Sequence, residues 1–195
     1  LLFGLEMAKS LAPIVMKFGG TSLRDESCRE KALDHVKKYA EAGERVVVVV
    51  SAMGRKGEPY STDTLVNLLK EVGPSICPRE LDLVMSVGES ISSAFFTHLL
   101  TQNGLPAISF NGRQAGILTD DNAGNAEILE INPERIIEAL DEGYITVVAG
   151  FQGVNDKGDI RTLGRGGSDT SAVALAAALE AEKVEIFSDV DGIAN

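Results

Sequence analysis

The chain alternates between two hydrophobic periods, and this alternation predicts strands that are separated by helices. Mostly apolar runs without polar alternation occur at residues 14–18, 45–51, 106–111, 144–151 and 183–189. Runs of this kind are typical of strands that are covered on both faces of a parallel sheet. "RVVVVVS" at 45–51, with five successive valines, is the clearest of them.

Between these runs, apolar residues recur at the spacing of amphipathic helices. The helical pattern occupies residues 26–42, 63–72, 79–103, 133–143 and 168–181. Gly43 ends the first pattern, and Pro133 stands in a first-turn position of the fourth. Residues 112–132 lack a clean period and could hold a small hairpin. The order of elements predicts an α/β fold, a three-layer α/β/α sandwich with a mainly parallel sheet.

Composition narrows the possible partners. The chain has 195 residues, 44% of them hydrophobic and 24% charged, which suits one globular domain. Its formal net charge of −11 argues against nucleic acid or an anionic membrane as a partner. No apolar run approaches the roughly 20 residues that a membrane span needs. Cys28 and Cys77 form no CxxC pair, so we expect free thiols, no zinc site and a cytoplasmic protein.

Several of the predicted strands end in the same kind of sequence. "MKFGGTS", "VVVSAMG" and "VVAGFQG" each leave a strand through Gly or Ser, and "TLGRGGSDTS" leads into a helix in a similar way. Ligands of parallel sheets bind outside the carboxyl ends of the strands. We therefore expect these loops to converge on one crevice.

The residues of these loops favour two anions as ligands. Lys17 supplies a point charge for a phosphate, and Gly19 and Gly20 allow close approach of backbone N–H groups. Arg165, in a second glycine-rich loop, has a planar guanidinium that suits a carboxylate or a phosphate. A lone K-x-G-G is a weak signal that ordinary turn chemistry also explains, and neither the Walker nor the dinucleotide motif is present. Two such loops together fit a phosphate donor and an anionic acceptor.

Two acidic residues have alternative interpretations. Asp169 could cap the start of its helix, or it could orient Lys17 or bind an ammonium group. Glu89 lies within an apolar helical pattern, and a buried acid of this kind is expected to have a cationic partner. His35 and His98 are interpreted as ordinary surface or core residues, and no Ser/His/Asp or Cys/His arrangement is evident. The absence of a good base favours a carboxylate acceptor, which is already ionised at neutral pH.

Taken together, these motifs resemble the aspartate kinases of the amino acid kinase family. "KFGGTS", "VVVVVSAMG", "VGE", "VVAGFQG", "TLGRGGSDTSAVALAAAL" and "FSDVDGI" stand in the order and approximate spacing of that family. The resemblance implies the amino acid kinase, or carbamate kinase-like, fold. It also implies phosphorylation of the β-carboxylate of L-aspartate by ATP to give 4-phospho-L-aspartate. That reaction leads to diaminopimelate, lysine, threonine and methionine.

The resemblance also implies roles for individual residues. ATP, with Mg²⁺ bound to it, would contact Lys17, Phe18, Gly19, Gly20, Ser51, Ser188 and Asp189. L-Aspartate would contact Thr62, Glu89, Gly164, Arg165, Gly166, Gly167 and Ser168. Lys17 and Asp169 would be the catalytic pair, with Asp169 organising the site. Glu89 would bind the substrate ammonium and Arg165 a substrate carboxylate, and no side chain is implied as a metal ligand.

The ends of the chain depart from the family pattern. Met7, followed by Ala8 and Lys9, is a candidate natural start, and we expect residues 1–12 to be a leader or added sequence. Residues 13–195 would form the catalytic domain. The family continues beyond "SDVDG" with an adenine-contacting loop, a second phosphate-site lysine and two regulatory ACT domains, whereas this chain stops at "SDVDGIAN". We therefore expect this segment alone to recognise aspartate but to be a poor or inactive kinase.

Two alternatives to an aspartate kinase stay open at this point. One is another member of the superfamily, acting on acetylglutamate, carbamate or UMP, although "LGRGGSD" favours an amino-acid carboxylate. The other is a non-catalytic module that binds aspartate or assembles with another chain. We also expect homo-oligomers. In this segment alone, the apolar strand at 183–189 would lie near an open sheet edge, so we expect the isolated fragment to associate or aggregate more than the intact protein.

Overall fold

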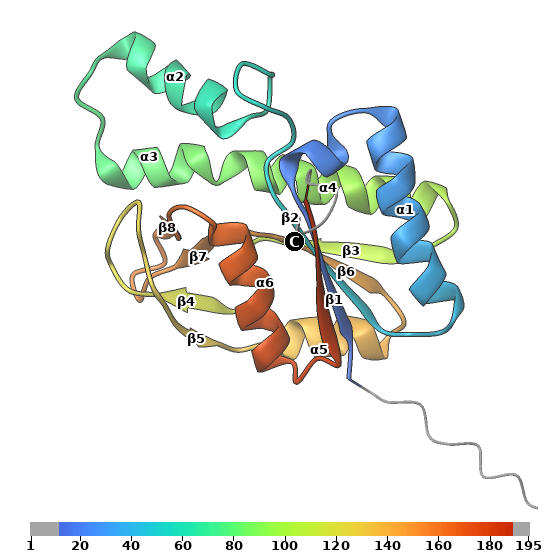
Figure 1. The fold of residues 1–195 in the computed structure, drawn as a ribbon. Helices are drawn as coiled ribbons and strands as arrows, with labels where there is room; N and C mark the ends of the chain where they lie inside the picture. Colours follow the sequence, from blue (N-terminus) through green and yellow to red (C-terminus); the bar gives the residue numbers. More distant parts are fainter. Residues whose placement is uncertain (1–11, 189–195) are drawn as a thin grey trace, which may run out of the picture.

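Five parallel strands form the central sheet of the protein (Figure 1). The computed structural model describes residues 12–188. Within them the strands are β1 (Ile14–Phe18), β2 (Val46–Val50), β3 (Ala107–Phe110), β6 (Ile145–Ala149) and β9 (Lys183–Phe187). Their order is β3-β6-β2-β1-β9, and every neighbouring pair is parallel. The carboxyl ends of the strands therefore lie along one edge of the sheet, as the apolar runs predict.

Helices cover both faces of this sheet because successive side chains of a strand point to opposite faces. Val48 of β2 belongs to a buried cluster with side chains of α1 (Glu26–Glu41) and α4 (Val87–Gln102). Its neighbours Val47 and Val49 belong to a second cluster, with side chains of α5 (Glu134–Asp141) and α6 (Gly167–Ala178). This arrangement confirms the three-layer α/β/α sandwich with a mainly parallel central sheet.

A second, smaller sheet stands beside the first and was only partly foreseen. Its strands are β4 (Ile117–Thr119), β5 (Ile128–Ile131), β7 (Gln152–Val154) and β8 (Ile160–Thr162), in the order β5-β4-β7-β8. The antiparallel pair β4–β5 confirms the hairpin suggested for residues 112–132. The hairpin β7–β8 was missed, because strands of three residues are too short to show a hydrophobic period.

The remaining helices differ from the predicted segments in detail. After the short 3₁₀ turn η1 (Gly20–Leu23) and β2 come α2 (Thr62–Val72), α3 (Pro78–Met85) and α4, so the segment 79–103 forms two helices. Ser86, between α3 and α4, keeps a right-handed helical conformation, and the two helices run on from each other (Figure 1). Pro133 is the N-cap of α5 and not its first helical residue.

By length and composition, the joined helix Pro78–Gln102 could also cross a membrane. Its packing gives another reason for its apolar composition. Phe96 and Leu100 are fully buried in the cluster on the sheet, and Glu89 and Ser92 are buried on the same helix. A helix in the core of a globular domain can be as long and as apolar as a membrane-spanning helix.

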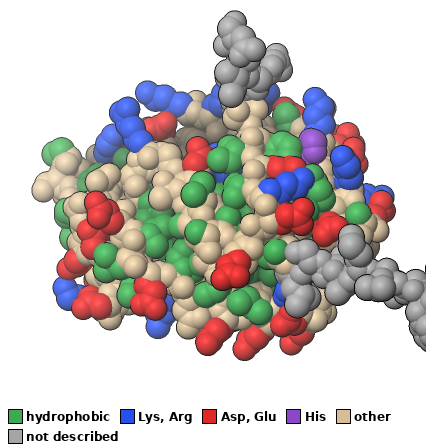
Figure 2. Space-filling model, turned by 60° about the horizontal axis from the view of Figure 1, so that its bottom comes forward, with side chains coloured by type: hydrophobic (Ala, Val, Ile, Leu, Met, Phe, Trp, Pro, Cys, Tyr) green, Lys and Arg blue, Asp and Glu red, His purple; other side chains and the backbone are tan. Residues whose placement is uncertain are grey.

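The surface carries the negative charge that the composition implies. Acidic side chains are spread over the face that Figure 2 brings forward, interrupted by small apolar patches. Cys28 and Cys77 are both free, as expected. Within residues 12–188, β3 and β9 are the two outer strands of the central sheet.

Candidate active site

A cavity of about 350 Å³ opens at the carboxyl ends of the central strands. The loops that follow β1, β2 and β6 all contribute to it, as does the loop that leads from β8 into α6. The predicted shared crevice is thereby confirmed. The predicted site residues that line this cavity are Lys17, Gly20, Ser51, Thr62, Glu89, Gly164, Arg165, Gly166, Gly167, Ser168 and Asp169.

Lys17 and Asp169 form an ion pair inside this cavity. Lys17 is on β1 and its side chain is mostly buried, and its Nζ lies 2.7 Å from Oδ1 of Asp169 in the first turn of α6. Asp169 does not cap the helix, because the N-cap position is occupied by Gly166. The pair holds an ammonium group at a fixed point between the two glycine-rich loops.

Gly20 allows the loops after β1 and β2 to pack against each other. A Cβ atom at this position would lie 2.4 Å from the carbonyl oxygen of Ala52, closer than any side chain can approach. The N–H of Gly54 donates a hydrogen bond of 3.1 Å to the carbonyl of Gly20. A side chain at residue 20 would therefore push apart the two loops that form this wall of the cavity.

Glu89 is a buried carboxylate with an unfilled hydrogen-bonding position. Its side chain is on α4, only 3% of the residue is exposed, and Oε1 accepts a hydrogen bond of 3.1 Å from the N–H of Ala52. Oε2 has no hydrogen-bond partner. Burial raises the pKa of Glu89 to about 7, and the hydrogen bond from Ala52 opposes this shift. Within residues 12–188 no Lys, Arg or His side chain forms an ion pair with Glu89, so the expected cationic partner stays a prediction.

The loop that carries Arg165 forms another part of the cavity lining. Gly166 has φ of +72° and is the N-cap residue of α6. The residues of the first turn of this helix line the cavity. Backbone N–H groups at a helix N-terminus favour an anion, and Arg165 adds an exposed guanidinium beside them. The cavity lining therefore contains both positive groups, at Arg165 and the start of α6, and the carboxylate of Glu89.

Phe151 is a cavity residue that the sequence analysis did not assign. It has φ of +69°, in the left-handed region that bulky residues rarely adopt. Its N–H donates to Oγ of Ser171 at 3.0 Å, and its carbonyl accepts from the N–H of Leu163 at 2.9 Å. Phe151 thus joins the end of β6 to the start of the Arg165 loop. The "AGF" exit from the strand was the available signal, but a strained φ cannot be read from residue types.

Some predicted nucleotide-binding residues lie outside this cavity. The side chain of Phe18 is in the core and stacks on Phe187, with ring centroids 4.8 Å apart. Phe18 and Ser188 border a second cavity of about 360 Å³, which Arg24 and Lys31 also line. Gly19 lines neither cavity, and its N–H bonds to the carbonyl of Phe187 at 3.4 Å. Asp189 lies outside the described residues.

Comparison with known proteins places this arrangement in a family. The model of the amino acid kinase family matches residues 12–195. Aspartokinase 1 of Bacillus subtilis is 54% identical over 180 residues, which are 92% of this chain and 45% of the relative. The chain belongs to the amino acid kinase family. It spans about 45% of the length of this curated relative.

Solved structures give the same assignment. The aspartate kinase from Synechocystis superposes with a TM-score of 0.75 at 44% identity, covering 92% of this chain and 29% of that protein. Aspartokinase III of E. coli, in complex with aspartate and ADP, superposes with a TM-score of 0.76 at 29% identity, covering 93% of this chain and 50% of that one. The central sheet and its helices are thus those of the family.

Proposed function

We propose that the protein containing this chain is an ATP-dependent aspartate kinase, and that residues 13–188 supply its aspartate side and part of its ATP phosphate side. The observation that carries this proposal is the presence of opposite charges in the lining of one cavity. Glu89 offers a buried carboxylate with a free oxygen, while Arg165 and the start of α6 offer positive charge. Similarity to aspartokinases, one of them solved with aspartate and ADP, supports the same conclusion.

An α-amino acid supplies the groups that such a cavity lacks. In this proposal the ammonium group of L-aspartate pairs with Glu89, and a carboxylate of the substrate pairs with Arg165. A buried carboxylate needs a cation to offset its loss of hydration, and the substrate would bring that cation. Acetylglutamate has an uncharged amide at the same place, and carbamate and UMP have no ammonium group. Glu89 therefore favours aspartate over the acceptors of the other family members considered above.

Lys17 would act on the phosphoryl group that is transferred. An oxygen of the substrate β-carboxylate attacks the γ-phosphorus of ATP and forms a P–O bond. The bond from that phosphorus to the β,γ-bridging oxygen breaks, and ADP leaves with the electron pair. The attacking carboxylate carries no proton, so no general base is required. Lys17, held by Asp169, neutralises charge on the phosphoryl oxygens, and this stabilises the transition state more than the ground state.

Mg²⁺ would enter with the nucleotide. In residues 12–188 there is no group of three or more His, Cys, Asp or Glu side chains that could hold a metal ion. The phosphate oxygens of ATP are themselves good Mg²⁺ ligands, and the metal supplies further neutralisation of their charge. The proposal therefore assigns Mg²⁺ to the ATP complex and not to a protein cage.

Trapping of the product tests the proposed function. The full-length gene product is incubated with ATP, Mg²⁺ and hydroxylamine, which converts an acyl phosphate into a hydroxamate. We expect ADP and hydroxamate in equal amounts with L-aspartate, and none with N-acetyl-L-glutamate, carbamate or UMP. Equal turnover with another acceptor would assign the chain to a different kinase. Aspartate binding without transfer would support the non-catalytic alternative.

A further inference from the structure

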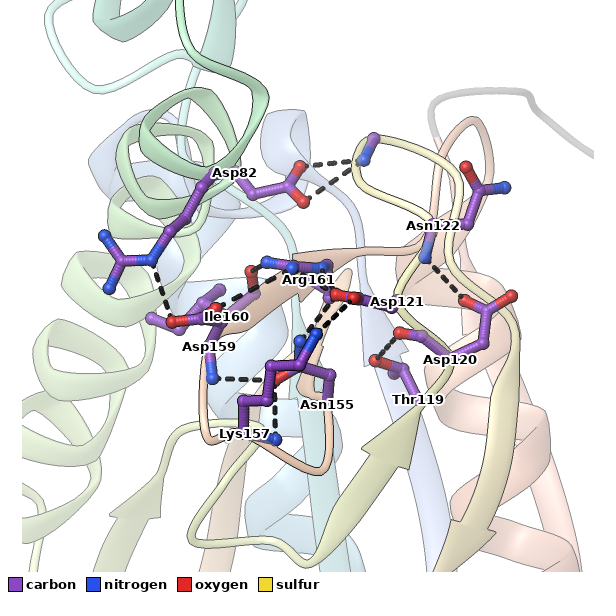
Figure 3. A network of polar contacts seen from close by, with 12 residues as sticks. Asp82, Thr119, Asp120, Asp121, Asn122, Asn155, Lys157, Asp159, Ile160 and Arg161 are labelled. Carbon is purple, nitrogen blue, oxygen red and sulfur yellow. Dashed lines mark hydrogen bonds and ion pairs between the residues drawn. The ribbon is translucent and has the colours of Figure 1, made fainter.

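Asp82 joins helix α3 to the small sheet through a buried set of hydrogen bonds. Only 1% of the residue is exposed. Its carboxylate accepts from the N–H of Gly124, at 3.0 Å to Oδ1 and 3.1 Å to Oδ2. Oδ1 also accepts a hydrogen bond of 2.6 Å from the hydroxyl of Thr162 on β8. Figure 3 shows the carboxylate of Asp82 reaching from its helix to the turn beyond Asn122.

Both partners of Asp82 lead to the Arg165 loop. Thr162 is the last residue of β8 and stands three residues before Arg165. Gly124 belongs to a turn that packs on Gly164. A Cβ atom on Gly164 would lie 2.5 Å from Oδ1 of Asn125 in this turn. Gly164 has φ of +74°, so its conformation also favours glycine. Asp82 therefore restrains the entry to the Arg165 loop along the strand and through the turn that supports it.

The helical segment that carries Asp82 continues to Glu89. Asp82 and Glu89 are seven residues apart on a helical path, which is two turns, about 10 Å along the axis and on nearly the same face. The N–H of Ser86 bonds to the carbonyl of Asp82 at 3.0 Å, which keeps the helical ladder between them intact. Gln152 of β7 donates to the carbonyl of Ser86 at 2.9 Å and ties the same segment to the small sheet.

We propose that Asp82 is a positioning residue that fixes Arg165 relative to Glu89, and thereby fits the site to the length of its acceptor. This inference rests on the proposed function, because it assumes that Glu89 and Arg165 bind the two ends of one amino acid. Asp82 does not line the cavity and would not contact the substrate. Its effect would be exerted through the Gly124 turn and the end of β8.

The Asp82→Asn substitution tests this role with little change in volume. An asparagine can accept a hydrogen bond through one atom only, and its NH₂ group would face the donor N–H of Gly124. We expect the KM for aspartate to rise about tenfold or more, since a displacement of about 1 Å can cost about 100-fold in rate. The KM for ATP is expected to stay within about twofold by the same reasoning, because the contacts of Lys17 are unchanged. Discrimination between L-aspartate and L-glutamate should fall.

Thr162 provides a milder test in case Asp82→Asn does not fold. Thr162→Val removes the hydroxyl that bonds to Asp82 but keeps the shape of the side chain. Thr162→Ser keeps the hydroxyl. We expect the valine variant to raise the KM for aspartate by several-fold, as one lost hydrogen bond to a charged group would. The serine variant should remain close to the wild type.

Asp121→Asn is the control, because Asp121 belongs to a neighbouring polar network and lies in the loop between β4 and β5. Asp121 bonds to Asn155, Lys157 and Arg161, and Asp82 is not among its partners. Kinetics of hydroxamate formation and thermal unfolding are measured for every variant of the full-length gene product. The inference is supported if the KM for aspartate rises in the Asp82 and Thr162→Val variants but not in the control.

The outcomes separate the two proposals. If the wild type phosphorylates aspartate but the KM for aspartate is unchanged in Asp82→Asn and Thr162→Val, Asp82 is not a positioning residue. The inference is also overturned if Asp121→Asn raises that KM equally, since general loosening of the sheet would then explain the effect. A wild type that does not phosphorylate aspartate contradicts the proposed function itself.

Discussion

The two sheets of the molecule are stabilised in different ways. In the central sheet, β1, β2 and β6 are buried along their whole length and pack through apolar side chains on both faces. The small sheet instead contains buried polar residues, among them Thr119, Gln152, Arg161 and Thr162. Around it, Asp121 pairs with Arg161 and Lys157 (Figure 3), and Arg79 pairs with Asp159.

This difference corresponds to a division of tasks in the proposed reaction. Lys17 is on the central sheet, where backbone pairing with β2 and β9 holds its main chain and apolar side chains pack on both faces. Arg165 follows the small sheet, where directional hydrogen bonds set the position of the loop. Packing is insensitive to direction, whereas a hydrogen bond weakens steeply when its geometry is wrong. In the proposal, the acceptor side relies on side-chain hydrogen bonds such as that from Thr162 to Asp82, which specify the position of the loop narrowly.

The largest expected effect is on turnover, from Lys17 on the central sheet. Lys17→Ala should lower kcat by about 100- to 1,000-fold, the typical cost of removing one group that stabilises charge in the transition state. The KM for aspartate should change far less. Steady-state rates of the full-length gene product measure both constants. A raised KM for aspartate with unchanged kcat would place Lys17 on the acceptor side and break the comparison.

Glu89→Gln should change the pH dependence of stability. The pKa of Glu89 is raised to about 7 from 4.5, so the folded state retains a proton between these values that the unfolded chain has released. The free energy of unfolding therefore falls as the pH rises through this window. The substitution should restore up to about 3 kcal/mol at pH 8 and almost nothing at pH 4. It should also weaken aspartate binding strongly.

Urea denaturation of the full-length gene product at pH 4 to 8 measures this effect, and isothermal calorimetry measures aspartate binding. Glu130→Gln is the control, because Glu130 is an exposed glutamate on β5 of the small sheet. If the free energy of unfolding depends on pH in the same way in wild type and Glu89→Gln, the pKa of Glu89 is not changed by folding, and its carboxylate is not a desolvated charge. In that case Glu89 would not require a cation from the substrate.

Arg165→Ala should act on binding of the acceptor and not on turnover. We expect the KM for aspartate to rise about 10- to 100-fold, which is the usual range for lost hydrogen bonds between charged groups. Arg165→Lys should recover only part of the loss, because an ammonium cannot form the paired contacts of a guanidinium. A drop in kcat with unchanged KM would assign Arg165 to the phosphoryl group and remove the proposed division between the sheets.

The smallest effects concern stability and test the comparison of the sheets directly. Val48→Ala removes two methyl groups from the fully buried centre of β2, and it should lower the free energy of unfolding by about 2 kcal/mol. Asp121→Asn, on the half-exposed polar network of the small sheet, should cost less, because solvent screens its ion pairs. Chemical denaturation of both variants checks the order. A larger loss for Asp121→Asn would show that the small sheet carries the stability.

Sequence alone determined the layers and the location of the chemistry. Wholly apolar runs such as 46–50 indicate buried parallel strands, and the glycine exits after them indicate one shared edge, because both signals are local and periodic. The two glycine-rich loops with Lys17 and Arg165 could be predicted for the same reason. The hairpin β7–β8 could not, since three-residue strands owe their pairing to partners elsewhere in the chain.

Only the tertiary structure decided which charges are paired. The sequence did not decide whether Asp169 caps its helix or pairs with Lys17, and it predicted a cationic partner for Glu89 without locating it. In the folded protein Asp169 pairs with Lys17, while the carboxylate of Glu89 accepts a backbone N–H from Ala52. Asp82, 42 residues from Gly124 and 80 from Thr162, gave no sequence signal at all. Such contacts depend on where distant elements meet, and packing of the whole sandwich fixes that geometry.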